Sequence, residues 1–354
     1  VNEISKAITS VLEMDELLSL CLKEINEKLK VKHSSIMLID DDGDGLIVKA
    51  CHGDRSKQAL GKTQKIDEGV AGRVVAERKP ILVTDIRRDN RFNRSERPDY
   101  KTKSFVSAPL IVEERVLGVI NVIDKASGDS FCETDVNLLC TIAGQVSIAV
   151  ENARLYEALE ENCFNMVTAL AKSLEAKDKY TSGHSQRVAE YSSVMARTMG
   201  VSDKDMTTLR HAALLHDIGK IGISEFIINK TDKLNDTEFA TIKSHPCQGE
   251  QIIKPLTFLD DAIHHIRSHH ESFDGRGYPD RLGGDDLSLL TRIMTVADAF
   301  DAMTSDRTYR SSMKTNKAVS ELRRVAGKQF DPEVVDAFAS SEIVKMKSDL
   351  ESNY

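Results

Sequence analysis

Three features that are absent from the sequence limit the cellular compartments and the binding partners that we expect for the protein. Its six cysteines are scattered and include no Cys-x-x-Cys spacing, which favours reduced thiols. No stretch approaches the roughly 18 apolar residues of a membrane span, and no signal peptide is visible. An excess of basic residues is also absent, because the net charge is −8 and the pI is near 5.8. We therefore expect a cytoplasmic protein that binds neither a nucleic-acid polymer nor an anionic membrane.

The length of 354 residues is that of two domains of ordinary size. The first residue is Val1 rather than Met, so we expect further sequence upstream. Because the chain is acidic, an enzyme of this composition that acts on an anion needs metal ions or local arginines to receive it.

The first predicted domain covers residues 1–150 and mixes helices with strands. Apolar residues recur at helical spacing from residue 4 to residue 29. β-Branched or alternating runs at 35–39 and 46–50 flank the turn 40–45 and predict a hairpin, and further runs lie at 81–84, 104–111 and 116–123. A short helix entered through glycines is predicted at 69–75. The pattern predicts an α+β domain with an antiparallel sheet flanked by helices.

This half of the sequence resembles a GAF domain over residues 12–155. The resemblance is carried by the helix at 69–75 and by the stretches Val83-Thr84-Asp85, Ser107-Ala108-Pro109-Leu110 and Gly118-Val119-Ile120-Asn121-Val122. It implies a sensory domain that binds a small molecule, which the sequence leaves unknown, or that binds none and only mediates dimerisation.

Cyclic-nucleotide-binding GAF domains carry an Asn-Lys … Phe-x-x-x-Asp-Glu signature. This chain has Asp124 in place of the Asn and Val136 in place of the Glu. We therefore expect no cyclic-nucleotide signature here, and interpret Lys125 and Asp135 as a surface ion pair that closes the last loop.

A long helix is predicted to connect the two domains over residues 135–178. Apolar residues from Leu139 to Leu174 step by three and four, and no proline or glycine interrupts residues 145–180. A helix that two domains share in this way is a candidate parallel coiled-coil stalk, through which we expect a homodimer. The alternative is a helix that packs against its own two domains, which the imperfect heptad leaves open.

The second predicted domain, residues 160–354, is almost entirely helical and contains eight of the ten histidines. His216 and Asp217 follow the apolar residues 212–215 at the end of a buried helix, where polar groups without a partner are costly. His184 follows a helix-start signature, and His245 precedes Pro246 at a helix entrance. The remaining candidate ligands are His269, His270 and Asp298.

Separate helices can deliver these seven side chains to one point, because about one helix and its loop lies between successive candidates. Five imidazoles and two carboxylates without a thiolate suit iron or manganese better than structural zinc. This set, together with water, can fill the coordination positions of two octahedral ions that share Asp217. Such a pair of ions activates water and clamps a phosphoryl oxygen during in-line displacement. The pattern therefore predicts a two-metal hydrolase of phosphate esters.

Residues from about 163 to 340 closely resemble an HD-GYP domain, the cyclic-di-GMP phosphodiesterase branch of the HD phosphohydrolases. The resemblance is carried in order by residues 180–188, 215–222, 244–246, 269–271, 274–279, 296–304 and 306–310. The fifth of these segments reads Asp-Gly-Arg-Gly-Tyr-Pro. The resemblance implies an all-α helical bundle for this half of the chain.

The resemblance also implies two groups of metal ligands. One metal would take His184, His216, Asp217 and Asp298, and the other would take Asp217, His245, His269 and His270. Tyr180 stands where members of the family with a third ion have a glutamate, so we expect two divalent ions, iron or manganese. Asp301 and Glu271 fall outside this set, and we interpret them as helix caps or as hydrogen-bond acceptors for ligand histidines.

Further roles follow from the same resemblance. Asp217 and Lys220 would be catalytic, with Lys220 beside the scissile phosphate as a charge stabiliser or a proton donor to the leaving oxygen. Arg307 and Arg310 would grip the other phosphate of the substrate. Tyr278 would form a wall of the substrate site or contact a partner.

The implied activity is hydrolysis of cyclic di-GMP to pGpG and onward to GMP, regulated by the GAF domain. Two alternatives stay open. One is the same chemistry on another cyclic dinucleotide, such as cyclic GMP-AMP. The other is a non-catalytic signalling scaffold, against which the complete ligand set and the presence of Lys220 argue.

Overall fold

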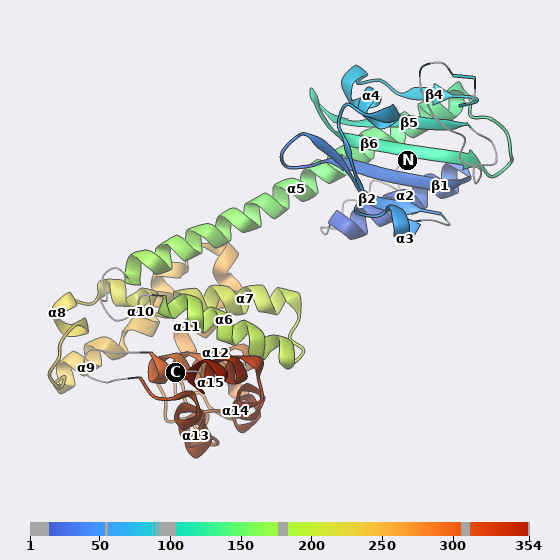
Figure 1. Ribbon diagram of the computed structural model, residues 1–354. Helices are drawn as coiled ribbons and strands as arrows, with labels where there is room; N and C mark the ends of the chain where they lie inside the picture. The colour runs from blue at the N-terminus through green and yellow to red at the C-terminus, as the bar shows by residue number, and fades with distance from the viewer. Residues whose placement is uncertain are drawn as a thin grey trace. The chain divides into compact units, whose positions relative to one another are not determined.

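The computed structural model describes residues 14–53, 56–86, 88–89, 91, 104–175, 183–305 and 312–352 (Figure 1). The chain divides into two compact units, Val1–Glu160 and Glu161–Tyr354. Each unit has a hydrophobic core of its own. None of the described helices combines the length and the apolar character that crossing a bilayer requires.

A six-stranded antiparallel sheet forms the centre of the first unit. Its strands are β1 (Val31–Ile39), β2 (Gly45–His52), β3 (Thr63–Lys65), β4 (Ile81–Val83), β5 (Phe105–Val112) and β6 (Arg115–Lys125). They pair in the order β3-β2-β1-β6-β5-β4. The predicted hairpin β1–β2 is present, and β5 and β6 also pair as antiparallel neighbours. The antiparallel sheet is thus confirmed. The strand β3 was not predicted, because its three residues, Thr-Gln-Lys, include no apolar residue that would mark a strand.

Helices lie over both faces of this sheet (Figure 1). They are α2 (Met14–Leu29), α3 (Ser56–Ala59), α4 (Gly69–Glu77) and the long α5 (Glu133–Glu175). Successive residues of a strand point to opposite faces. Ile36 and Leu38 therefore join the core that contains α2 and α5, whereas Met37 joins the smaller core that contains α4. This is the α+β architecture that the sequence predicted.

The loop between β6 and α5 closes as predicted. The Nζ atom of Lys125 lies 2.7 Å from Oδ2 of Asp135, and the backbone N–H of Cys132 donates to the same oxygen at 2.9 Å. The hydrogen bond to Asp135 raises the pKa of Lys125 above its usual value. The ion pair between Lys125 and Asp135 is therefore confirmed, and it ties the end of the sheet to the start of α5.

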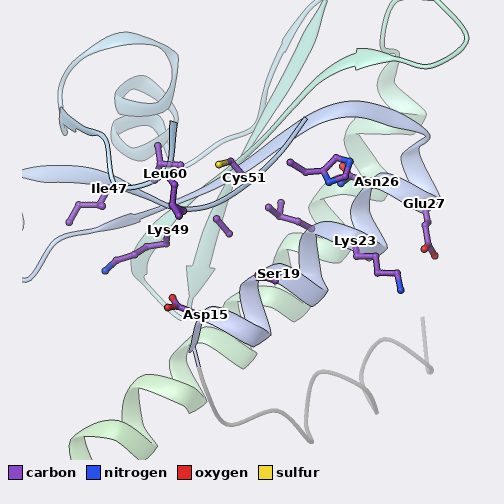
Figure 2. Close-up of a pocket in the computed structure, with 14 residues that line it drawn as sticks. Asp15, Ser19, Lys23, Asn26, Glu27, Ile47, Lys49, Cys51 and Leu60 are labelled. Atoms are coloured by element: carbon purple, nitrogen blue, oxygen red, sulfur yellow. The ribbon is translucent and has the colours of Figure 1, made fainter. Parts of the chain in front are cut away.

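A cavity of about 800 Å³ lies between α2 and β2 (Figure 2). Its lining includes Asp15 and Lys23 from α2 and Lys49 and Cys51 from β2, together with the exposed Leu60. Cavities of this size hold small molecules. The lining combines charges of both signs with apolar groups, so it favours a ligand of mixed polarity.

The described part of the second unit consists of helices, with one isolated bridge between Ala326 and Phe330. The helices are α6 (His184–Thr198), α7 (Asp203–Leu215), α8 (Glu225–Ile228), α9 (Asp236–Lys243), α10 (His245–Ile253), α11 (Asp260–Ser268), α12 (Leu289–Thr304), α13 (Thr315–Val325), α14 (Pro332–Ala339) and α15 (Glu342–Ser352), with the 3₁₀ helices η1 (Ile218–Gly222), η2 (Thr257–Leu259) and η3 (Gly284–Asp286). The all-α architecture predicted for this half is confirmed.

The helix α12 lies at the centre of this second core. Its Phe300 is fully buried and meets Tyr191 of α6 and Phe338 of α14 edge-on, with ring centroids 5.7 Å and 4.7 Å apart. Aromatic pairs in this geometry add to the free energy gained by burial. The tight packing fixes the position of α12, on which Asp298 lies.

The helix α5 contains the described part of the connecting helix that was predicted over residues 135–178, and residues 176–178 lie outside the described residues. Leu139 and Val146 are fully buried in the core of the first unit. Ile148, Leu155 and Leu159 are 59%, 59% and 57% exposed, at spacings of seven and four residues. One stripe of the helix therefore packs on its own unit and another remains uncovered by it.

Candidate metal centre

The seven predicted metal ligands come from five segments that meet at one point. His184 is the first residue of α6, His216 and Asp217 lie between α7 and η1, His245 is the first residue of α10, His269 and His270 follow α11, and Asp298 lies within α12. Six of the seven positions are therefore at the ends of helices, where side chains of different helices can converge. The helix entrance predicted for His245 is confirmed, and Pro246 occupies the first turn of α10.

The ligand atoms form two compact groups. His184, His216 and Asp217 make up one group and His245, His269 and His270 make up the other, and within each group the ligand atoms lie within 4.8 Å of one another. Asp217 links the groups, because its Oδ1 atom lies 3.3 Å from Nε2 of His245 and its Oδ2 atom lies 3.6 Å from Nε2 of His216. The structure thus brings together the residues that the sequence assigned to a shared site.

Three of the histidines are oriented by the backbone of the helix that precedes them. His216, His245 and His269 each place Nδ1 at 2.7–2.8 Å from the carbonyl oxygen three residues earlier. A ring nitrogen that faces a carbonyl carries its proton, which leaves the other nitrogen with a free lone pair. In each ring the Nε2 atom is therefore the one that can bind a cation.

His184 is oriented by a carboxylate instead. Its Nδ1 atom lies 2.7 Å from Oδ2 of Asp301, and Nε of Arg187 donates to the other oxygen of that carboxylate at 2.7 Å. On its opposite side, Nε2 of His184 lies 3.3 Å from Oδ1 of Asp298. Burial lowers the pKa of His184, but the hydrogen bonds to Asp298 and Asp301 outweigh it and raise the pKa to about 10. A cation that binds at Nε2 therefore displaces a proton.

Electrostatics keep His269, His270 and Asp217 in the protonation states that bind a metal ion, neutral for the histidines and ionised for the aspartate. Burial lowers the pKa of His269 well below its usual value, and burial together with neighbouring imidazoles lowers the pKa of His270 to about 4. Burial raises the pKa of Asp217, but the charge of Lys220, helped by the hydrogen bond to His245, outweighs it and holds the pKa well below the usual range. Neutral imidazoles and ionised carboxylates without a thiolate are the donor set that iron or manganese takes, so the residues fit such ions.

Lys220 reaches back to the centre from η1. Its Nζ atom lies 2.6 Å from Oδ2 of Asp217. The 3₁₀ helix places the two residues on one side because three residues complete its turn. A Cβ atom on Gly219 would lie 1.8 Å from the carbonyl oxygen of His245, so only glycine allows η1 to approach α10 this closely. We expect this contact to set the separation of Asp217 and His245.

Tyr278 contacts the centre through His270. The two rings lie 4.9 Å apart, tilted by 31°. The loop that carries Tyr278 is held by the buried Glu271, whose Oε1 atom accepts from the backbone N–H groups of Asp280 and Arg281 at 2.6 Å and 2.9 Å. Tyr278 is therefore fixed as a wall next to the histidine cluster.

Asp301 and Glu271, for which the sequence predicted the same roles, have different partners in the structure. Asp301 accepts from a candidate ligand histidine, as expected. Among the described residues, Glu271 accepts hydrogen bonds from the backbone of the loop that follows rather than from a histidine. The expectation for Glu271 was wrong because only the folded loop brings residues nine and ten positions later back to it. Arg307, Arg310 and Tyr180 lie outside the described residues.

Two family models match the chain. One is described as a GAF domain and matches residues 11–151. The other is described as an HD domain and matches residues 168–334. The second match contains all seven candidate ligands.

Among similar proteins, the 3'3'-cGAMP-specific phosphodiesterase 3 of Vibrio cholerae serotype O1 is 44% identical over 168 residues, which are 48% of this chain and 36% of that protein. The 3'3'-cGAMP-specific phosphodiesterase 2 of the same organism is 31% identical over 66% of this chain and 45% of its own length. The cyclic di-GMP phosphodiesterase response regulator RpfG of Xanthomonas campestris pv. campestris is 34% identical over 51% of this chain and 48% of its own length. The chain spans about half or less of the length of these curated relatives.

Proposed function

We propose that the part of the chain that matches the HD domain model is a metal-dependent phosphodiesterase that opens cyclic di-GMP to pGpG and onward to GMP, and that the part that matches the GAF domain model regulates it. The observation that carries the proposal is the convergence of five imidazoles and two carboxylates, with a lysine beside the shared carboxylate. The names of the relatives, all phosphodiesterases of cyclic dinucleotides, support the substrate class.

Each group has a part in the proposed reaction. The two ions, iron or manganese, would be held by His184, His216, Asp217 and Asp298 on one side and by Asp217, His245, His269 and His270 on the other. When bound, such ions activate water and neutralise phosphoryl charge. The ammonium of Lys220 already lies beside Asp217, so it reaches the scissile phosphate and offsets the charge that develops on the leaving oxygen. Asp301 keeps the ring of His184 in one orientation.

A second substrate is favoured by a specific observation. The relative that is 44% identical is named for 3'3'-cGAMP. Cyclic GMP-AMP offers the metal centre the same phosphodiester, so the bases decide between the two substrates. We propose cyclic di-GMP as the substrate and cyclic GMP-AMP as the alternative.

Metal analysis combined with turnover tests this function. We expect protein purified without oxygen and loaded with Fe²⁺ or Mn²⁺ to hold about two ions per chain, since the donor set can fill two sites that share Asp217. The same protein is expected to convert cyclic di-GMP to pGpG, and chromatography measures the product. Turnover of cyclic GMP-AMP at equal concentration is compared with it. Protein that holds both ions and yet neither binds nor cleaves a cyclic dinucleotide would support the non-catalytic scaffold instead.

We also propose that the exposed stripe of α5 pairs two copies of the chain, so that the GAF domain acts on a dimer. Ile148, Leu155 and Leu159 are each more than half exposed and follow the seven- and four-residue spacing of a coiled-coil seam. An apolar stripe that is exposed in the single chain is expected when the same helix of a second copy covers it in the dimer.

Glutamates in this stripe are expected to separate the dimer. We expect Leu155→Glu combined with Leu159→Glu to raise the dimer dissociation constant at least about hundredfold, because four leucines lose their burial and four charges enter the seam. Light scattering coupled to size exclusion measures the change. Leu60→Glu is the control, since Leu60 is 57% exposed but is not part of α5. If the double variant remains as dimeric as the control, the seam is not the interface.

A further inference from the structure

An exposed lysine lies against two aromatic rings beside the metal centre. Lys243 is the last residue of α9, two positions before His245. Its Nζ atom lies 4.6 Å from the centre of the Phe239 ring and 5.3 Å from the centre of the Tyr278 ring. We call Phe239, Lys243 and Tyr278 the aromatic–lysine wall. Its members come from α9 and from the loop that follows α11.

The junction between α9 and α10 holds Lys243 in place. The Oγ atom of Ser244 donates to the carbonyl of Thr241 at 2.7 Å and accepts from Nε2 of Gln248 at 2.8 Å. Phe239 lies one turn before Lys243, on the same face of α9. The backbone of Lys243 therefore has a defined position relative to His245, which is the next residue but one.

The wall adjoins the metal centre and carries an unused charge. Tyr278 stacks against His270, so the wall begins where the histidine cluster ends. Phe239 is 48% exposed, and Lys243 is exposed as well. Within the described residues, Lys243 has no carboxylate as a partner. A π surface and a positive charge are thus available together at the edge of the site.

We infer that Lys243 recognises a guanine base of the substrate, with the rings of the aromatic–lysine wall as the surface against which the base packs. The inference rests on the proposed function. Aromatic faces stack nucleobases with little regard to sequence. The ammonium discriminates, because guanine presents two acceptors, O6 and N7, whereas adenine presents N7 beside an amino donor. The scissile phosphate needs no help from Lys243, since the ions and Lys220 serve it.

Kinetic constants for two cyclic dinucleotides, one with guanine and one with adenine bases, test the inference. We expect Lys243→Met to raise the KM for cyclic di-GMP about tenfold, while the inhibition constant of cyclic di-AMP in the same assay changes less than about twofold. Lys243→Arg keeps a donor and is expected to retain most of the guanine preference. Lys254→Met serves as the control, because Lys254 is an exposed lysine at the opposite end of α10 and should leave both constants unchanged.

A second variant separates stacking from base reading. We expect Phe239→Leu to weaken cyclic di-GMP and cyclic di-AMP by similar factors, because both bases have the π face that the ring contacts. Equal weakening of both ligands by Lys243→Met would mean that the lysine binds phosphate, and no change in either would mean that it binds nothing. Both results would overturn the inference.

The metal-loaded parent protein distinguishes the failure of this inference from the failure of the proposed function. If the parent protein hydrolyses cyclic di-GMP and Lys243→Met keeps the full preference for guanine, only the role of Lys243 is wrong. If the parent protein holds its ions but acts on no cyclic dinucleotide, the proposed function is wrong and this inference falls with it.

Discussion

Replacing Asp217 by asparagine is expected to lower the turnover of cyclic di-GMP at least about thousandfold, which corresponds to about 4 kcal/mol of activation free energy. One oxygen of Asp217 lies 3.3 Å from Nε2 of His245 and the other lies 3.6 Å from Nε2 of His216, so one carboxylate faces both ligand groups. An amide has the same shape but lacks the charge and one of the acceptor atoms. In Asp217→Asn one ion would therefore lose a ligand, and the other would keep only an uncharged amide oxygen.

Metal content and turnover of Asp217→Asn are measured on the same preparation. We expect at least one of about two ions per chain to be lost, because the shared carboxylate contributes to both sites. Asp336→Asn is the control, since Asp336 lies on α14 with 77% of its side chain exposed and should change neither quantity. A variant at Asp217 that keeps both ions and more than about a tenth of the turnover would contradict the bridging role.

Local sequence signals were sufficient to place the elements that carry the site. The apolar run before His216 predicted the buried end of α7, and Pro246 predicted that a helix begins at His245. Turn residues between β1 and β2 likewise predicted a hairpin. Such signals work because helix ends, turns and apolar periodicity depend on residues that are neighbours in the chain.

Contacts between distant segments were not accessible in the same way. Glu271 was expected to serve a helix end or a histidine, but it holds the loop of Asp280 and Arg281. Lys243 carries no motif of its own, and its place beside Tyr278 arises only when α9 and the later loop meet. Composition and spacing do not report which backbone groups face a side chain after folding.

At Gly219, η1 packs so closely against α10 that the methyl group of an alanine would not fit. A Cβ atom there would lie 1.8 Å from the carbonyl oxygen of His245 and 2.6 Å from the backbone nitrogen of Gly249. Both are backbone atoms of α10, so the helix itself would have to move. We expect Gly219→Ala to lower the free energy of unfolding by about 3 kcal/mol and to abolish turnover, because α10 carries His245 away from Asp217.

Gly222→Ala is the matched control for this variant, since Gly222 lies in the same 3₁₀ helix three residues later. A Cβ atom on Gly222 would meet only the end of the Gln248 side chain, 2.3 Å from its Oε1 atom, and that flexible side chain can shift while the backbone stays in place. We expect denaturant unfolding of Gly222→Ala to stay within about 0.5 kcal/mol of the parent protein, with its metal content intact. If Gly219→Ala matched this control in stability and in metal content, η1 and α10 could separate without moving a ligand. The distance between Asp217 and His245 would then be set by the ions rather than by the contact at Gly219.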